Sequence, residues 1–168
     1  MRKTTVNLKA AFAGESQANR KYIIFAEKAD EEGQPRVARL FRAAADAEAV
    51  HARNHLQAMQ GIRTTAQNLD EAIGGENYEF TEMYPIFIEQ AEKEENVDQA
   101  EDSFRMANKV EKIHHALYRE ALDTLERGAT GELKPFYVCQ YCGNTVEGEA
   151  PDRCPVCGRP RKIFKLVE

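Results

Sequence analysis

The pattern Glu-x-x-His occurs twice in this chain, at Glu48/His51 and at Glu111/His114. Residues three positions apart lie on one face of an α-helix, so each pair presents a carboxylate and an imidazole in the same direction. A single pair is weak evidence in a chain with 28 acidic residues and 4 histidines. Two pairs, each among apolar residues with helical spacing, constrain the fold because both polar faces must turn inward and find partners.

Four helical segments are predicted before the cysteine-rich tail, separated by glycine, proline or asparagine. We expect them at about residues 7–32, 35–60, 69–95 and 97–127. Pro35 suits a first helical turn, whereas Pro85 is expected to kink the third helix. The first and third connections are short and the middle one is longer, which is the connectivity of a ferritin-like four-helix bundle with one crossover. The expected fold class is therefore mainly α, with a small C-terminal metal-binding domain.

Each predicted helix turns at least one carboxylate toward the core. The inward-facing acids and imidazoles are Glu15, Glu48, His51, Glu76, Glu79, Glu111 and His114. Burying one unpaired carboxylate costs several kcal/mol, so five would exceed a typical domain stability of roughly 5 to 15 kcal/mol. The inward faces carry no lysine or arginine that would neutralise them. We infer a pair of metal ions bridged by carboxylates, as in di-iron or di-manganese four-helix bundles.

The four cysteines lie in two Cys-x-x-Cys-Gly turns near the C-terminus. They are Cys139, Cys142, Cys154 and Cys157. This spacing predicts one tetrathiolate metal site, and it suits either zinc or iron. The neighbouring di-metal site favours iron, because an enzyme that cycles two irons needs electrons delivered one at a time. We therefore expect two domains, with the helical bundle at residues 1–130 and the cysteine domain at residues 131–168.

Composition and charge argue against nucleic acid and membranes as binding partners. The net charge of −5 disfavours nucleic acid, which usually needs a clustered basic face. The longest apolar run, at residues 22–26, is too short to span a bilayer, and we expect no membrane association. Closely spaced Cys-x-x-Cys pairs without a secretory leader favour metal ligation in a reducing compartment, so a cytoplasmic location is expected.

Several motifs together closely resemble the rubrerythrin family over nearly the whole chain. They are AFAGESQANRKY, AEAVH, ENYEFTEMYP, VEKIH, CQYC and PDRCPVCG. The resemblance implies a ferritin-like bundle with a non-haem di-iron centre and a rubredoxin-like domain with a single iron, for which zinc is a possible substitute. One departure is Asn144, which stands where rubredoxin-like domains often have an aromatic residue.

The resemblance also implies residue roles. The di-iron ligands would be Glu15, Glu48, His51, Glu76, Glu79, Glu111 and His114. Glu48 and Glu111 would bridge the two irons, and one iron would exchange Glu79 for His51 when the centre is reduced. The four cysteines would hold the single iron.

The activity implied by the family is an oxidoreductase function, the reduction of hydrogen peroxide to water in defence against oxidative stress. Electrons would come from a rubredoxin or an NAD(P)H-dependent rubredoxin reductase and pass through the tetrathiolate iron. A homodimer is implied, with the tail of one subunit near the di-iron site of the other, and helix pairs can be exchanged between subunits.

Three other interpretations of the sequence remain open. A ferritin-like ferroxidase or iron-storage protein would use a similar di-iron site but leaves the cysteine tail without a purpose. A di-manganese catalase would disproportionate peroxide without an external reductant. A non-enzymatic helical module with a zinc ribbon would leave the inward-facing acids unexplained.

Overall fold

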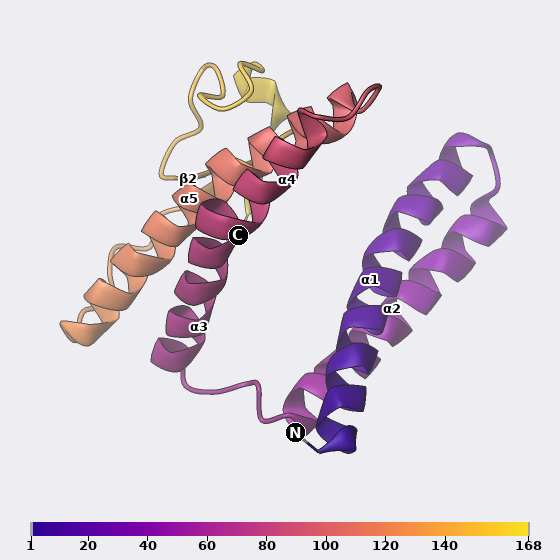
Figure 1. The fold of residues 1–168 in the computed structure, drawn as a ribbon, viewed down its shortest axis with the longest axis horizontal. Helices are drawn as coiled ribbons and strands as arrows, with labels where there is room; N and C mark the ends of the chain where they lie inside the picture. Colours follow the sequence, from indigo (N-terminus) through magenta and orange to yellow (C-terminus); the bar gives the residue numbers. More distant parts are fainter. Residues whose placement is uncertain (1, 168) are drawn as a thin grey trace. The chain divides into compact units, whose positions relative to one another are not determined.

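The computed structural model describes residues 2–167 and divides into two compact units, residues 1–63 and 64–168. The first unit is a pair of helices. The second unit contains the remaining helices and a small β-sheet tail (Figure 1). None of the helices in the part of the chain that the structure describes is long and apolar enough to cross a membrane.

The first unit is an antiparallel hairpin of α1 (Lys3–Glu31) and α2 (Pro35–Ala58). Gly33 turns the chain between them with a φ of 70°, a conformation that glycine adopts without a steric penalty. Small side chains let the two helices approach closely; the buried ones are Ala26, Ala29, Ala38, Ala45 and Ala52. The amide of Asn19 donates a 2.8 Å hydrogen bond to the carbonyl of Ala45 and ties the helices together. Both predicted helices are confirmed, although the first begins earlier than expected.

The second unit begins with a long helical segment that is interrupted near its middle. This segment comprises α3 (Thr65–Tyr78), the π-helix η1 (Glu79–Met83) and α4 (Tyr84–Ala91). Pro85 has no N–H to donate to the carbonyl four residues earlier, so the regular α-helical ladder fails here. The amide of Tyr84 instead reaches the carbonyl of Glu79, five residues back. The kink expected at Pro85 is therefore a π-helical turn just before it.

The start of α3 was predicted too late, at Leu69. Thr64 and Gln67 form a capping box that satisfies free amides at the N-terminus, so the helix begins at Thr65. The last helix, α5 (Asp98–Glu126), agrees with the prediction to within one residue at each end. Aromatic rings of Tyr84, Phe87 and Phe104 pack between α4 and α5.

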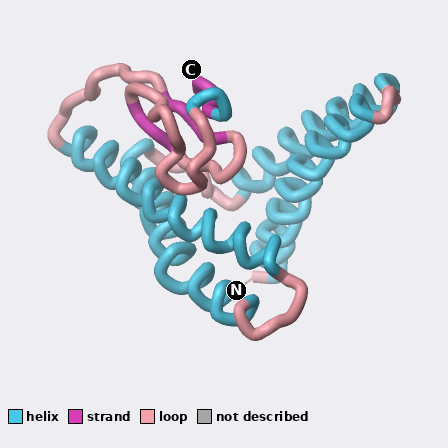
Figure 2. The backbone as a smooth tube through the Cα atoms, turned by 90° about the horizontal axis from the view of Figure 1, so that it is seen from above, coloured by secondary structure: helices cyan, strands magenta, loops and turns pink. Residues whose placement is uncertain are grey.

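The tail forms a three-stranded antiparallel sheet in the order β2-β1-β3. Its strands are drawn in magenta in Figure 2. Its elements are β1 (Phe136–Cys139), β2 (Thr145–Glu147), the 3₁₀ turn η2 (Arg161–Ile163) and β3 (Phe164–Val167). In the central strand, Cys139 pairs with Phe164, and Val138 pairs with Thr145 on the other side. Within the second unit, the tail lies against α5: a Cβ atom on Gly143 would be 3.7 Å from Cγ1 of the buried Val110.

Candidate metal centres

The first unit contains a triad of Glu15 from α1 and Glu48 and His51 from α2. The Nδ1 atom of His51 lies 2.9 Å from Oε2 of Glu48 and 3.9 Å from Oε1 of Glu15. One ligand atom from each residue lies within 4.8 Å of the others. The Glu-x-x-His spacing therefore places Glu48 and His51 side by side on one face of α2, as predicted. The neighbouring helix α1 adds Glu15 as a third possible ligand.

The second unit contains an equivalent triad of Glu76 from α3 and Glu111 and His114 from α5. Here the Nδ1 atom of His114 lies 2.8 Å from Oε2 of Glu111 and 3.8 Å from Oε2 of Glu76. These ligand atoms also lie within 4.8 Å of one another. Each triad thus combines two carboxylates with the Nδ1 atom of one histidine. This donor set is suited to iron or manganese.

The electrostatics of the second triad fit a bound cation. Burial and the neighbouring Glu111 raise the pKa of Glu76 to about 7. The Oε2 atom of Glu76 is buried and has no hydrogen-bond partner. The hydrogen bond between Glu111 and His114 lowers the pKa of the acid and raises that of the imidazole. A metal ion would neutralise the two acids and occupy the unpaired oxygen, so the residues present fit a metal centre.

Two further groups lie near the second triad. Glu79 is the first residue of the π-helix, and burial together with the charge of Glu111 raises its pKa. Burial and the charges of Glu111, Glu79 and Glu76 raise the pKa of Tyr84. The π-helical turn changes the angular spacing between Glu79 and Tyr84, and both side chains are close enough to feel the charge of Glu111. Tyr84 was not among the site residues expected from the sequence, although it lies inside the motif ENYEFTEMYP.

The four cysteines form a compact group in the tail. The sulfur atoms of Cys139 and Cys157 are 3.7 Å apart, and those of Cys142 and Cys154 are 3.6 Å apart. Four sulfurs bound tetrahedrally at about 2.3 Å from a metal would be about 3.8 Å from one another. All four are free cysteines and their sulfur atoms lie within 4.8 Å of one another, which fits the predicted four-cysteine metal site.

Backbone amides of the Cys-x-x-Cys-Gly turns donate to these sulfurs. Burial raises the pKa of Cys154, but hydrogen bonds from the amides of Cys157 and Val156 and from the thiols of Cys142 and Cys157 together lower it to about 7. Burial raises the pKa of Cys142, against the amide of Asn144, which lowers it. The side chain of Asn144 is 1% exposed and its Nδ2 atom has no hydrogen-bond partner.

One hydrogen bond joins the cysteine-bearing tail to the second triad. Thr145, at the start of β2, has its hydroxyl 2.9 Å from Nε2 of His114. Thr145 could not be identified from the sequence, because no linear pattern indicates a contact between positions 31 residues apart.

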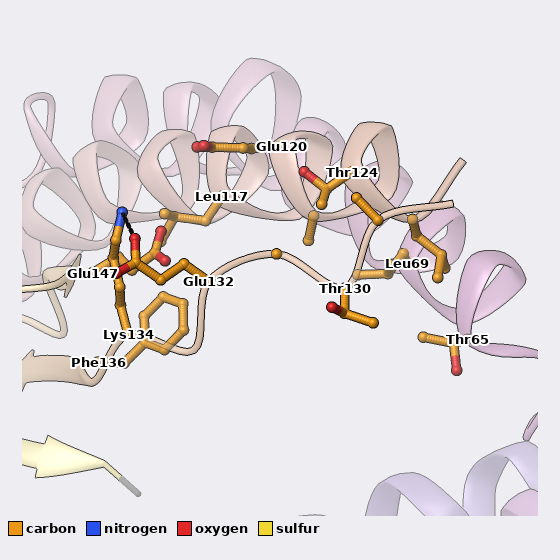
Figure 3. Close-up of a pocket in the computed structure, with 14 residues that line it drawn as sticks. Thr65, Leu69, Leu117, Glu120, Thr124, Thr130, Glu132, Lys134, Phe136 and Glu147 are labelled. Carbon is orange, nitrogen blue, oxygen red and sulfur yellow. Dashed lines mark ion pairs between the residues drawn. The ribbon is translucent and has the colours of Figure 1, made fainter. Parts of the chain in front are cut away.

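A cavity of about 700 Å³ lies between α3, α5 and the chain that leads into the tail (Figure 3). An ion pair of 3.3 Å between Lys134 and Glu132 lies at its edge. The cavity shares no lining residue with either triad or with the four cysteines. The residues that could bind metal therefore lie outside this cavity.

Two protein-family models match the chain. The model described as rubrerythrin matches residues 7–122, and the model of the rubrerythrin rubredoxin-like domain matches residues 137–165. The chain is 36% identical to a rubrerythrin of Porphyromonas gingivalis, with 99% of this chain and 90% of that protein aligned. It is 35% identical to nigerythrin of Nitratidesulfovibrio vulgaris, with 96% and 85% aligned.

Solved structures give a consistent result. Nigerythrin in a mixed-valence state matches with a TM-score of 0.58 and 32% identity, covering 99% of this chain and 88% of that chain. Fully reduced, all-ferrous nigerythrin matches with a TM-score of 0.59 at the same identity and coverage.

Proposed function

This chain belongs to the rubrerythrin family, and from that premise we propose that it reduces hydrogen peroxide to water with electrons relayed through its tetrathiolate site. Family membership makes it a di-iron oxidoreductase of oxidative-stress defence. It also confirms the expected fold class, mainly α with a ferritin-like helical part and a rubredoxin-like tail. The cofactor prediction is also confirmed. The chain has carboxylate and histidine groups for a di-iron centre and a four-cysteine site for a single iron.

The proposed di-iron ligands are the two triads together with the additional carboxylate on the π-helix. They are Glu15, Glu48, His51, Glu76, Glu79, Glu111 and His114. The repetition of one donor set supports this assignment, because each triad offers one imidazole nitrogen and two carboxylates. If iron is bound, Glu48 and Glu111 would be the carboxylates shared by the two metals, and Glu79 and His51 would be alternative ligands of one iron in the oxidised and reduced centre.

When bound, the di-iron centre supplies two electrons and Lewis acidity to the O–O bond of peroxide. The overall reaction, hydrogen peroxide with two protons and two electrons giving two waters, also needs proton donors. Tyr84 is suited to this task, because burial and the charges of Glu111, Glu79 and Glu76 hold its pKa above the usual value and keep the phenol protonated. Its hydroxyl can then donate a hydrogen bond toward the acids or toward substrate.

Electrons are proposed to enter through the four-sulfur site from a rubredoxin or an NAD(P)H-dependent rubredoxin reductase. A reducing, cytoplasmic compartment is part of the proposal, because the four thiols must stay free to bind metal. We also propose a homodimer, and a functional division into residues 1–130 for peroxide chemistry and 131–168 for electron entry.

One observation carries this proposal: a triad that fits a redox metal is hydrogen-bonded to the part of the chain that holds the four clustered cysteines. The test is steady-state peroxide consumption by iron-loaded protein with NADH, a rubredoxin reductase and a rubredoxin. We expect one NADH oxidised per peroxide, and no turnover without the donors. Peroxide loss without any donor would favour a catalase instead, and retention of oxidised iron in a large assembly would favour iron storage.

A further inference from the structure

We propose that an exposed basic surface around the second cysteine turn is the docking site for an acidic protein that carries a one-electron redox centre. The surface is formed by Tyr141, Arg153, Arg159 and Lys162, and we call it the basic patch. The inference rests on the proposed function, because it gives the electron donor a place to bind on the tail. It goes further by assigning the charge of that donor and the side chains that it contacts.

The tail carries a charge opposite to that of the rest of the chain. Residues 136–167 contain five basic and three acidic side chains, although the whole chain has a net charge of −5. All five basic residues lie in the stretch 153–165, which contains no acid. An acidic protein is therefore repelled by most of the molecule and attracted by this part of the tail, so electrostatic steering favours one orientation of the encounter.

The cations of the basic patch are free to pair with a partner. Arg161 lies outside the patch, because its guanidinium is already paired with Glu149 at 3.0 Å and with Asp152 at 3.2 Å. By contrast, no carboxylate of residues 2–167 forms an ion pair with the three cations of the patch, and all three side chains are exposed. Their charge is available to carboxylates on another protein.

The basic patch lies beside a sulfur atom of the four-cysteine site. The backbone amide of Arg159 donates a hydrogen bond to the sulfur of Cys157, which is partly exposed. The side chain of Arg153 turns back to the same loop, where its Nη1 atom donates a 3.1 Å hydrogen bond to the carbonyl of Gly158. A protein bound to these two arginines would lie next to a ligand of the proposed iron site, which is where an electron carrier must dock.

An aromatic ring joins the parts of the basic patch. Tyr141 is 51% exposed, and the guanidinium carbon of Arg159 lies 3.8 Å from the centre of its ring. This cation–π contact connects the first cysteine turn to the end of the second. Lys162 in η2 is held beside the first turn, because the carbonyl of Ile163 accepts a hydrogen bond from the amide of Gln140. A ring surrounded by cations suits the small, polar interfaces of transient redox complexes.

Packing of the tail within the second unit leaves the basic patch uncovered. The tail reaches α5 through β2 and the first cysteine turn, where Thr145 is hydrogen-bonded to His114 and Gly143 lies close to Val110. The tail can therefore keep its place on α5 and bind a partner through the patch at the same time.

Nucleic acid is the other class of polyanion that arginines bind, and the same observations disfavour it. Three free cations offer few phosphate contacts, and the chain as a whole is acidic. The position of the patch beside Cys157 also has a purpose for an electron carrier and none for a phosphate backbone.

The test is a titration of the ¹⁵N-labelled full-length protein with a rubredoxin of net negative charge, both loaded with zinc so that no electron is transferred. At low ionic strength we expect shifts of the amide signals of the basic patch and of Cys157. The Kd should rise about 10-fold when salt is raised from about 0.01 M to about 0.15 M, because the Debye length shortens from about 30 Å to about 8 Å.

Two pairs of substitutions separate local charge from net charge. Arg159→Glu with Lys162→Glu should raise the Kd at low salt about 10- to 100-fold, because like charges then face each other across the interface. Arg20→Glu with Lys21→Glu makes the same change in net charge at exposed positions of α1 and should raise it less than about 3-fold. Arg159→Lys with Lys162→Arg keeps both charges and should bind as the wild type does.

Absence of binding at low salt, a Kd that does not depend on salt, or equal effects of the two charge reversals would overturn the proposal. Tighter binding of a single-stranded oligonucleotide to the same amides would also overturn it, in favour of a phosphate site. The titration involves neither iron nor peroxide. Loss of the proposed peroxidase activity and loss of the proposed docking site can therefore be told apart.

Discussion

The two triads have the same residue types at the same spacing, yet their surroundings differ. In the α1–α2 hairpin, Glu15, Glu48 and His51 lie on two helices that pack through alanines. In the second unit, the equivalent group has a π-helix beside it and a hydrogen bond from His114 to the tail. The first triad thus lies on a simple helix pair, whereas the second is hydrogen-bonded to the tail that carries the four cysteines. The proposal requires both.

The largest expected effect comes from removing one carboxylate from each triad in turn. Glu48→Ala and Glu111→Ala should each lower peroxide turnover at least about 100-fold, since even groups that only orient metal ligands cost 10- to 100-fold. Iron content and turnover of the purified variants provide the measurement. A variant that keeps full turnover would remove its triad from the catalytic centre.

Co-expression of these two variants tests whether one centre draws on one chain or on two. If each centre combines triads from different chains, a mixed dimer has one intact centre and regains about half of the turnover of the wild type. If each centre is built within one chain, the mixed dimer remains inactive. The measurement requires purification through two different affinity tags.

A smaller effect on turnover is expected from Glu79, the additional proposed ligand on the π-helix. Glu79→Ala should lower turnover about 10-fold and leave the helices folded, because the two triads would still bind iron. Glu82→Ala, which alters the same π-helix, is the matched control. Equal turnover in wild type and Glu79→Ala would exclude Glu79 from the ligand set.

The metal-free protein should lose stability as the pH rises. Burial raises the pKa of Glu76 to about 7, and the hydrogen bond to Glu111 raises the pKa of His114. The folded state therefore keeps protons that the unfolded chain releases, and this stabilisation is lost as the pH rises through the folded-state values. The pKa of Glu111 is lowered, so its contribution is lost only below its ordinary value of 4.5.

We expect the Tm of metal-free protein to be a few degrees lower near pH 8 than near pH 5. Glu76→Gln should reduce this difference, whereas the exposed Glu126→Gln should not. Thermal unfolding followed by circular dichroism provides the measurement. A Tm that rises over this pH interval would contradict the environment described for Glu76.

The smallest effect concerns the packing of the first unit. Asn19→Ala removes the hydrogen bond to the Ala45 carbonyl and should cost about 1 kcal/mol. Thr64→Ala removes the cap of α3 in the second unit and should cost a similar amount, about 1 kcal/mol. Calorimetry then shows whether the two units unfold together. If they do, both variants shift a single transition; if not, each shifts its own.

The sequence was sufficient where local rules decide the structure. Pro35 at a first helical turn, the Glu-x-x-His faces and the Cys-x-x-Cys-Gly turns were all predicted correctly. The capping box at Thr64 and Gln67 is also a local signal, and it explains why α3 begins at Thr65 and not at the predicted Leu69.

Other features depend on packing that no local pattern specifies. The π-helix results from a missing donor at Pro85, but whether a proline kinks, breaks or widens a helix is decided by its neighbours. The hydrogen bond of Thr145 to His114 joins the tail to α5, and its geometry exists only in the folded second unit. The residues that link the two metal groups were therefore the ones that the sequence could not identify.

The most direct test of the account is stopped-flow oxidation of fully reduced, iron-loaded protein by hydrogen peroxide, with the absorbance of the two iron sites followed separately. We expect rapid oxidation of the di-iron centre and then oxidation of the tetrathiolate iron. In Cys142→Ser the first phase should remain and the second should be lost. Failure of peroxide to oxidise the di-iron centre in the wild type, or a tetrathiolate iron that stays reduced, would contradict a peroxidase with an internal electron relay.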